Sequence, residues 1–329
     1  MTVITYLQSY EAFKKEHINM DNILSIKDIY VNYAEKPVLR DVSLNIKKGH
    51  ILGVVGESGS GKSTIIKTVL GILGDNGCVK DGKIIFQDRD IIELPKEELR
   101  KIRGKDIALI SQDPSQAFHP VRKIGTQVNE FAKAHNENPE KVTARMLELL
   151  ELFKLSNPKR VLNSYSYELS GGMAQRVSIA MAMLLNPKVL LADEVTSALD
   201  VVVQREVVKQ FEKIKNEFQT SIFFVSHNMG VISYLADEIA VMYGGTVMEY
   251  GSRDNIVNNP VHEYTKKLYE AIPKMNVMVS KNVKATLPDR YTEGCPYHEG
   301  CSMACSECKT NMPELREIEP GHFVRCHEV

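Results

Sequence analysis

The chain has 329 residues, with 41 Lys and Arg against 42 Asp and Glu, so its formal net charge is −1. Hydrophobic residues make up 43% of the sequence and Trp is absent, a composition typical of an ordinary folded protein. The near-zero charge gives no general attraction to nucleic acid or anionic lipid. No stretch approaches the ~18 apolar residues of a membrane span, and the N-terminus lacks the apolar core of a secretory signal. We therefore expect a cytosolic protein with reduced thiols.

The predicted elements alternate between strands and helices. Residues 1–19 carry apolar side chains at helical spacing and predict a short amphipathic helix, unless Met20 is the true start. Strands are expected at 24–33, 39–46, 51–55, 83–86, 107–111, 189–192 and 222–225, and helices at 63–73 and over most of 125–182. The apolar runs have the length of strands buried on both faces of a parallel sheet. The alternation predicts a doubly wound α/β fold.

Residues 56–64 form a phosphate-binding motif. They fit G-x-x-x-x-G-K-[ST] between a predicted strand and a predicted helix, and read Gly56, Glu57, Ser58, Gly59, Ser60, Gly61, Lys62, Ser63, Thr64. Backbone N–H groups of such a loop converge on phosphate oxygens, and the positive end of the next helix adds to the attraction. We expect Lys62 to reach the β- and γ-phosphates and Ser63 to hold Mg²⁺. The alternative is a glycine-rich turn with an unrelated lysine.

The strand at 189–192 is followed by two carboxylates, Asp193 and Glu194. Asp193, at the tip of the strand, can hold Mg²⁺ directly or through water. Glu194 can polarise an attacking water. Alone, the pattern also fits a charged strand end that faces solvent.

Residues 168–176 resemble the signature motif of ATP-binding cassette (ABC) ATPases, and they lie between the two nucleotide motifs as in that family. From the residues alone, Ser170 also fits a helix N-cap. The resemblance implies that Ser170, Gly171 and Gly172 bind the γ-phosphate of an ATP held by a second subunit. It further implies a head-to-tail pair that encloses two nucleotides.

The other motifs of that family follow in order. Gln112 resembles the Q-loop residue that links Mg²⁺ and water to the membrane partner, and residues 197–200, ending in Asp200, resemble the D-loop. His227 resembles the switch histidine at the γ-phosphate. Tyr33 lies where the family places an aromatic ring on adenine. The resemblance makes Glu194, His227 and Gln112 the catalytic residues.

Residues 103–125 and 262–273 are similar to the oligopeptide/dipeptide/nickel importer subfamily, and the resemblance covers about 22–329. The sequence departs from that pattern at three places: Val195 replaces Pro, Ala174 replaces Arg, and Phe118-His119 replaces Leu-Asn. None of these removes a group expected to touch phosphate or water.

The resemblance implies a RecA-like parallel core, an antiparallel β part and a helical subdomain. We expect an N-terminal extension at 1–21, an ABC ATPase domain at 22–255 with its helical subdomain at about 125–182, and a cysteine-bearing C-terminal extension at 256–329. The implied partners are a second ABC ATPase, two membrane permeases and an extracellular or periplasmic binding protein, with no nucleic acid. The implied location is the cytoplasmic face of the membrane.

Five of the six cysteines lie in the last 35 residues: Cys295, Cys301, Cys305, Cys308 and Cys326. An odd number of thiols in a reducing compartment argues against disulfides. Four thiolates suit Zn²⁺ or an iron–sulfur cluster, and free thiols are the alternative. The resemblance selects all but Cys305 as the ligands and favours [4Fe–4S] over Zn²⁺.

The implied function is ATP hydrolysis that powers oligopeptide or dipeptide import, with ATP and Mg²⁺ as cofactors. Nickel or metal-chelate import is the alternative within the subfamily. A soluble ABC ATPase that acts on nucleic acid or ribosomes is a remote one, because such proteins usually carry two cassettes or a long inserted coiled coil.

Overall fold

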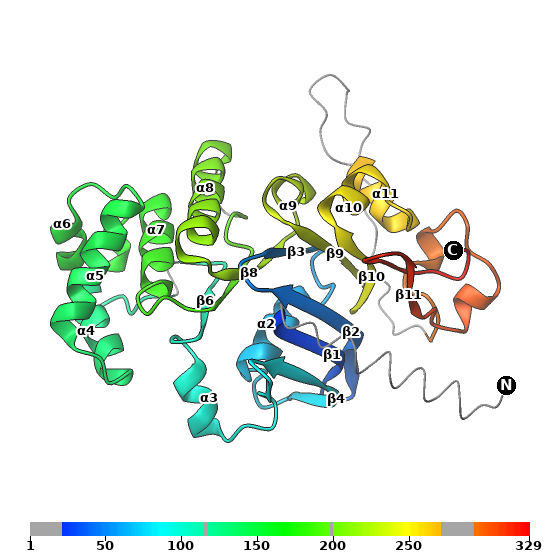
Figure 1. The fold of residues 1–329 in the computed structure, drawn as a ribbon, viewed down its shortest axis with the longest axis horizontal. Helices are drawn as coiled ribbons and strands as arrows, with labels where there is room; N and C mark the ends of the chain where they lie inside the picture. Colours follow the sequence, from blue (N-terminus) through cyan, green and yellow to red (C-terminus); the bar gives the residue numbers. More distant parts are fainter. Residues whose placement is uncertain (1–21, 115–116, 198–199, 271–292) are drawn as a thin grey trace.

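The computed structural model describes residues 22–114, 117–197, 200–270 and 293–329. The helix predicted within 1–19 and the D-loop residues 198–199 lie outside these ranges. Within them, an eight-stranded sheet has the order β11-β12-β10-β9-β3-β8-β7-β6 (Figure 1). Its parallel strands are β3 (Ile51–Gly56), β6 (Ile107–Ile110), β7 (Val189–Asp193), β8 (Ser221–Ser226) and β9 (Glu238–Tyr243). Three antiparallel strands complete it: β10 (Thr246–Ser252), β11 (Leu315–Glu319) and β12 (His322–Arg325).

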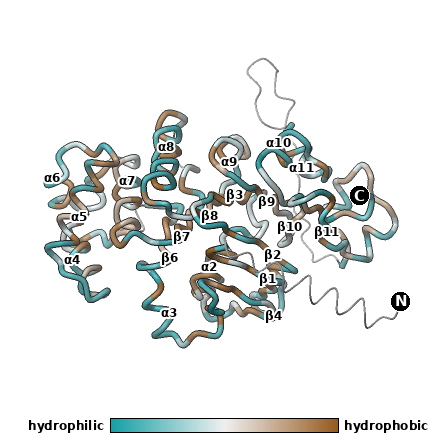
Figure 2. The backbone as a smooth tube through the Cα atoms, in the orientation of Figure 1, coloured by the Kyte–Doolittle hydropathy of each residue, from teal (hydrophilic) through white to brown (hydrophobic). Residues whose placement is uncertain are grey.

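A second, antiparallel sheet packs on one face of the parallel strands. It has the order β2-β1-β4-β5 and comprises β1 (Asn22–Tyr33), β2 (Lys36–Lys47), β4 (Gly77–Phe86) and β5 (Arg89–Asp90). Its apolar side chains share a core with α2 (Lys62–Leu70) and with Leu52, Leu191 and Phe223 of the larger sheet. Figure 2 shows hydrophobic residues gathered where the two sheets meet. The phosphate loop therefore leads from a fully buried strand into a helix enclosed between two sheets.

Helices cover the opposite face of the parallel strands, which supplies Ile51, Leu190 and Phe224 to a second core. The segment predicted as mostly helical resolves into separate helices, because Pro139 and Pro158 each begin a new one after an asparagine cap. These helices are α4 (Ile124–Ala134), α5 (Pro139–Leu152), α6 (Pro158–Asn163), the 3-10 turn η1 (Ser166–Glu168) and α7 (Gly171–Ala182). They form the group on the left of Figure 1.

The remaining helices connect or flank the sheets: α3 (Lys96–Ile102), α8 (Val201–Phe218), α9 (Met229–Leu235), α10 (Arg253–Asn258) and α11 (Glu263–Glu270). The helix predicted at 63–73 ends at Leu70, because Gly71 takes a left-handed conformation with φ 61° and caps it. Among the described residues, no helix is long and apolar enough to cross a membrane. The predicted α/β fold is confirmed, and α2 and the strand ends bring the phosphate motif and the acidic motif together.

The cysteine-bearing segment 293–329 is joined to the main sheet. It contains the 3-10 turns η2 (His298–Gly300) and η3 (Glu307–Lys309) and the hairpin β11–β12. Strand β12 pairs with β10, so that Glu249 faces Val324. The buried Arg325 guanidinium donates hydrogen bonds to Val247 O and Pro313 O, both at 2.9 Å, and to Asp41 Oδ2 at 2.9 Å. These contacts fix the C-terminal end of the chain against both sheets.

Candidate nucleotide site

The phosphate loop is held in shape by its glycines and by Lys62. Gly61 has φ 97°, and a Cβ there would lie 2.6 Å from Leu39 Cδ2, so only glycine fits. The buried Lys62 Nζ donates to Gly56 O at 2.8 Å and to Glu57 O at 2.7 Å. Burial lowers the pKa of Lys62, and nearby carboxylates oppose that shift. The ammonium is thus enclosed by the loop at the point where phosphate charge is expected.

Ser63 and Asp193 meet at the mouth of the loop. Ser63 Oγ donates to Asp193 Oδ1 at 2.8 Å, although 130 residues separate them in the chain. Burial raises the pKa of Asp193, and the hydrogen bond from Ser63 opposes that shift. A hydroxyl and a carboxylate are oxygen donors of the kind that Mg²⁺ takes. The structure therefore places two of the three predicted Mg²⁺ ligands together. The third, Gln112, makes its hydrogen bond to Ser197 instead.

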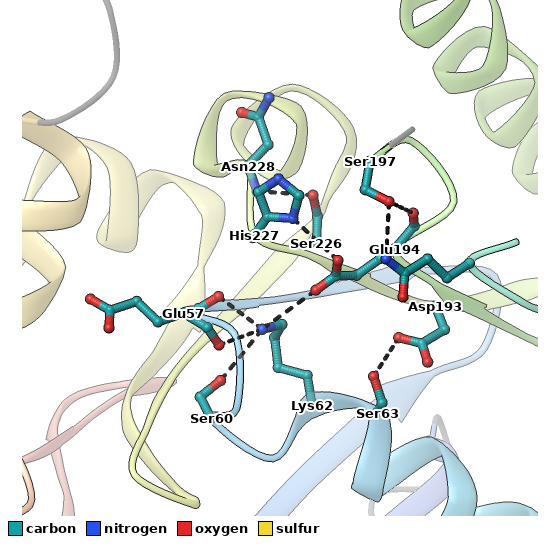
Figure 3. Close-up of polar contacts among 12 residues, drawn as sticks. Glu57, Ser60, Lys62, Ser63, Asp193, Glu194, Ser197, Ser226, His227 and Asn228 are labelled. Carbon is teal, nitrogen blue, oxygen red and sulfur yellow. Dashed lines mark hydrogen bonds and ion pairs between the residues drawn. The ribbon is translucent and has the colours of Figure 1, made fainter. Parts of the chain in front are cut away.

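Glu194 lies between two cationic or protonatable side chains (Figure 3). Its Oε1 is 3.7 Å from Lys62 Nζ, and its Oε2 is 3.2 Å from His227 Nδ1. Glu194 has φ 46°, a left-handed conformation that is uncommon for a residue with a side chain. Its N–H donates to Val225 O at 3.0 Å, which fixes this turn against β8. The turn directs Glu194 differently from its neighbour in β7.

Gln112 reaches the same site through Ser197, the first residue of the predicted D-loop, for which no role of its own is predicted. Gln112 Nε2 donates to Ser197 Oγ at 3.4 Å, and Ser197 Oγ donates to Glu194 O at 2.9 Å. Ser226 was also missed: its Oγ accepts from Asn228 N–H at 3.0 Å and shapes the turn that carries His227. The link from Ser197 to Gln112 spans 85 residues and has no local sequence signal. Ser226 acts only two residues along the chain, on the turn itself.

The predicted signature residues and D-loop aspartate lie apart from this cluster. Ser170 caps α7 by accepting from Met173 N–H at 3.3 Å, and Gly171 beside it has open space around its Cα. Asp200 caps α8 by accepting from two backbone N–H groups, each at 3.0 Å. Among the described residues, no hydrogen bond or ion pair links them to the phosphate loop. Both readings of Ser170, as a cap and as an anion site, are thus compatible with its position.

The other predicted nucleotide ligands stay near their expected places. Tyr33 ends β1 and is half-buried, with its ring against Gly77. Ser58 and Gly59 are exposed at the tip of the loop, and Ser60 is buried near Lys62, with its Oγ 3.5 Å from Nζ. Thr64 lies in the first turn of α2. Figure 3 shows the Glu57 side chain extending away from Lys62.

The predicted metal quartet is not arranged as a metal site. In the ranges that the structure describes, no group of three or more His, Cys, Asp or Glu side chains is placed to hold a metal ion, and all six thiols are free. Cys305 Sγ, the thiol left out of the predicted quartet, lies 3.4 Å from Cys308 Sγ. Burial raises the pKa of Cys295 to about 11, which favours the protonated thiol over the thiolate that a metal needs.

Two family models match parts of this chain. Residues 39–197 match the family model described as ABC transporter, and residues 248–308 match the C-terminal region of oligopeptide/dipeptide transporters. The oligopeptide transport ATP-binding protein OppD of Haemophilus influenzae is 36% identical over 93% of this chain and 97% of its own. The dipeptide transport ATP-binding protein DppD of Caldanaerobacter subterraneus is 38% identical over 94% and 97%.

Solved structures show the same fold. CbiO1 of Clostridium perfringens, part of an ABC transporter complex, aligns with a TM-score of 0.63 and 25% identity over 73% of this chain and 92% of its own. A dimeric ATP-binding cassette in a post-hydrolysis state with ADP and Pi aligns with a TM-score of 0.61 and 26% identity over 70% and 98%.

Proposed function

The chain belongs to the ABC transporter family, and on that premise we propose that it is the ATP-hydrolysing subunit that powers import of oligopeptides or dipeptides. The observation that carries the proposal is the position of Glu194 between Lys62 and His227, beside the Ser63–Asp193 pair. Relatives named for oligopeptide and dipeptide transport support the cargo. The match of 248–308 to their C-terminal region favours peptide over nickel.

The residues divide the work of phosphoryl transfer to water. Glu194 orients water or accepts its proton, and His227, hydrogen-bonded to that carboxylate, stabilises the γ-phosphate side. Lys62 supplies a fixed positive charge where negative charge develops. Ser63 and Asp193 would hold Mg²⁺, which, when bound, neutralises phosphate charge. Gln112 is linked to this site by its hydrogen bond to Ser197.

A second ATPase subunit completes the site in this proposal. The exposed N-terminus of α7, with Ser170 and Gly171, offers unpaired N–H groups to an anion held by a partner. Because Ser170–Gly172 and Lys62 belong to separate clusters in one chain, a head-to-tail pair would place each signature motif over the other subunit's nucleotide. We propose a heterodimer with a similar ATPase.

A groove between the helical segment and β6 suits a membrane permease. It has a volume of about 160 Å³ and is lined by Gly104, Leu109, Phe118, Phe131 and Met181, among others. Leu109 is 36% exposed, although it belongs to a strand of the main sheet. An apolar groove beside the Gln112 loop gives a permease segment a route to the nucleotide site. The chain would thus work at the cytoplasmic face of the membrane, with an external binding protein delivering the peptide.

We also propose that Cys295, Cys301, Cys308 and Cys326 hold a metal, with [4Fe–4S] favoured over Zn²⁺. The support is the set of four thiols and the backbone hydrogen bond from Cys295 N–H to Cys308 O at 2.8 Å. The four side chains would have to move together to bind, because the described structure does not group them as a metal site. Binding would require deprotonation of the buried thiols. Anaerobic purification with an absorbance scan and iron and zinc analysis tests this, and protein free of both metals would contradict it.

The cargo is tested with the chain assembled with its permeases in vesicles. Labelled di- and oligopeptides supplied with the binding protein should accumulate only when ATP is present on the side of this subunit. Uptake of nickel complexes without peptide uptake would contradict the proposal.

A further inference from the structure

Tyr264 of α11 reaches the phosphate loop from the C-terminal part of the chain. Its side chain is 2% exposed, and its hydroxyl accepts a hydrogen bond from Glu57 N–H at 3.2 Å. The carbonyl oxygen of Glu57 accepts a hydrogen bond from Lys62 Nζ at 2.7 Å. Glu57 is therefore held on both sides, by Tyr264 through its N–H and by the phosphate-binding lysine through its C=O.

The position of Tyr264 is itself fixed by buried polar contacts at the start of α11. Tyr264 N–H donates to His262 Nδ1 at 3.1 Å, and His262 N–H donates to the buried Glu249 carboxylate at 3.0 Å. Burial lowers the pKa of His262 to about 4, so at neutral pH its ring stays neutral and Nδ1 can accept. His322 of β12 contacts the same carboxylate at 2.8 Å. Helix α11 thus has little freedom to rotate.

Tyr264 packs in a cluster of three tyrosine rings that reaches the cysteine-bearing segment. The centroid of Tyr264 lies 4.7 Å from that of Tyr243, at the end of β9, and 5.1 Å from that of Tyr297. Tyr243 and Tyr297 are 5.2 Å apart, edge to face. Tyr297 follows Cys295 by two residues, and both are buried. The segment 295–297 therefore packs directly behind the ring that contacts the phosphate loop.

We infer that Tyr264 is a positioning residue for the phosphate loop, through which the segment 295–297 acts on ATP binding. This inference rests on the proposed ATPase function. Without the hydroxyl, Glu57 N–H loses its partner and the start of the loop loses a restraint. A smaller fraction of molecules then holds the loop ready for phosphate, which weakens the apparent affinity by that fraction.

The test compares Tyr264→Phe with Tyr269→Phe in the full-length chain assembled with its partners. Tyr269 lies on the same helix, and its hydroxyl makes no hydrogen bond with the described residues. Tyr264→Phe should raise KM for ATP by roughly 3- to 10-fold, the usual effect of one lost hydrogen bond, with kcat within about 2-fold. Tyr269→Phe should change neither. An unchanged KM in Tyr264→Phe, or a loss confined to kcat, would overturn the inference.

Binding of a fluorescent ATP analogue to the intact chain is measured in parallel. This binding assay needs no peptide. A wild-type chain that binds ATP but supports no import would contradict the proposed function. The comparison of Tyr264→Phe with Tyr269→Phe would still be decisive. Affinity should fall in Tyr264→Phe by the same factor as KM rises.

The link to segment 295–297 is tested by a double-mutant cycle. Tyr297→Leu removes the ring behind Tyr264 and should raise KM in the wild-type background but not further in Tyr264→Phe. Tyr297→Met has a longer, more flexible side chain that can follow the space of the ring, and it serves if the leucine variant does not fold. Independent, multiplicative effects of the two substitutions on KM would overturn the link.

Discussion

Glu194 shows how one backbone conformation sets the chemistry of the site. Its left-handed φ of 46° turns the carboxylate away from Asp193 and toward Lys62 and His227. Two adjacent acidic residues thereby face different partners: Asp193 faces Ser63, and Glu194 faces the place where water is expected. The backbone turn thus separates the proposed Mg²⁺ ligand, Asp193, from the proposed base, Glu194.

Glu194→Gln should bind ATP normally and lose turnover. Glutamine keeps the shape of the side chain but cannot take a proton from water, so we expect steady-state hydrolysis in the assembled complex to fall by at least ~100-fold. The control is Glu148→Gln on the exposed face of α5, which should keep wild-type turnover. Hydrolysis near the wild-type rate in Glu194→Gln would refute the assignment.

Local spacing in the sequence was sufficient to predict most of these residues. It was not sufficient to predict the contacts between distant segments. Gly61, Lys62 and Ser63 follow from a motif with a strand before it and a helix after it. The role of Ser197 depends on Gln112, 85 residues away, and that of Tyr264 depends on Glu57, 207 residues away. A sequence carries no local signal for either pair.

At the scale of elements, α11 and the β11–β12 hairpin are fixed by buried polar groups rather than by apolar packing alone. Glu249, fully buried in β10, accepts from Val261 N–H and His262 N–H and contacts His322. No strand is predicted after 222–225, although four follow in the described structure. Strand β9 pairs in parallel with β3, and β10, β11 and β12 extend the sheet from β9 by antiparallel pairing. The cysteine-bearing segment is also joined to the main sheet by the pairing of β12 with β10, which no local pattern in the sequence predicts.

The buried His262 should make the folded protein less stable as the pH falls below about 6.5. Its pKa is about 4 in the folded protein against 6.5 for a free histidine, so below 6.5 the unfolded chain takes up a proton that the folded chain does not. Stability should therefore fall by about 2 kcal/mol more in the wild type than in His262→Asn between about pH 6.5 and pH 5. The Asn side chain can still accept from Tyr264 N–H but does not titrate. Urea unfolding measures the difference, and parallel pH profiles would exclude this role.

The buried Arg325, which joins the C-terminal hairpin to both sheets, should be costly to remove. Arg325→Met leaves the carbonyls of Val247 and Pro313 and the carboxylate of Asp41 without their partner, which should destabilise the fold by about 3–5 kcal/mol. Arg316→Met, in the neighbouring strand, removes an exposed hydrogen bond to Cys326 O and should cost less than about 1 kcal/mol. Equal losses in urea unfolding would show that burial of Arg325 does not matter.

At the scale of the whole molecule, the phosphate loop and the predicted signature residues lie on different parts of one chain. The phosphate loop lies between the sheets, whereas the predicted signature residues begin α7, in the helical group (Figure 1). Val202, in the first turn of α8 near the start of α7, is 74% exposed. An apolar side chain so exposed beside an open helix N-terminus is compatible with a surface that a partner subunit covers.

Ser170→Arg should separate binding from hydrolysis across such a pair. A large side chain at the start of α7 should leave ATP binding by this chain within about 2-fold, because its own phosphate loop is untouched. Hydrolysis at the partner's phosphate loop should fall. To measure it, the catalytic glutamate is left intact only in the partner, so that all hydrolysis comes from the partner's site. Unchanged hydrolysis in that arrangement would place the partner's signature contact elsewhere.

The central claim is that ATP hydrolysis by this chain is coupled to peptide import. The most direct measurement is ATP hydrolysis by the transporter reconstituted in vesicles, with its binding protein supplied either empty or loaded with peptide. We predict that peptide-loaded binding protein stimulates hydrolysis several-fold, that Glu194→Gln abolishes both the stimulation and peptide uptake, and that nickel complexes have no effect. Hydrolysis at the same rate with and without peptide, or peptide uptake that persists in Glu194→Gln, would contradict the claim.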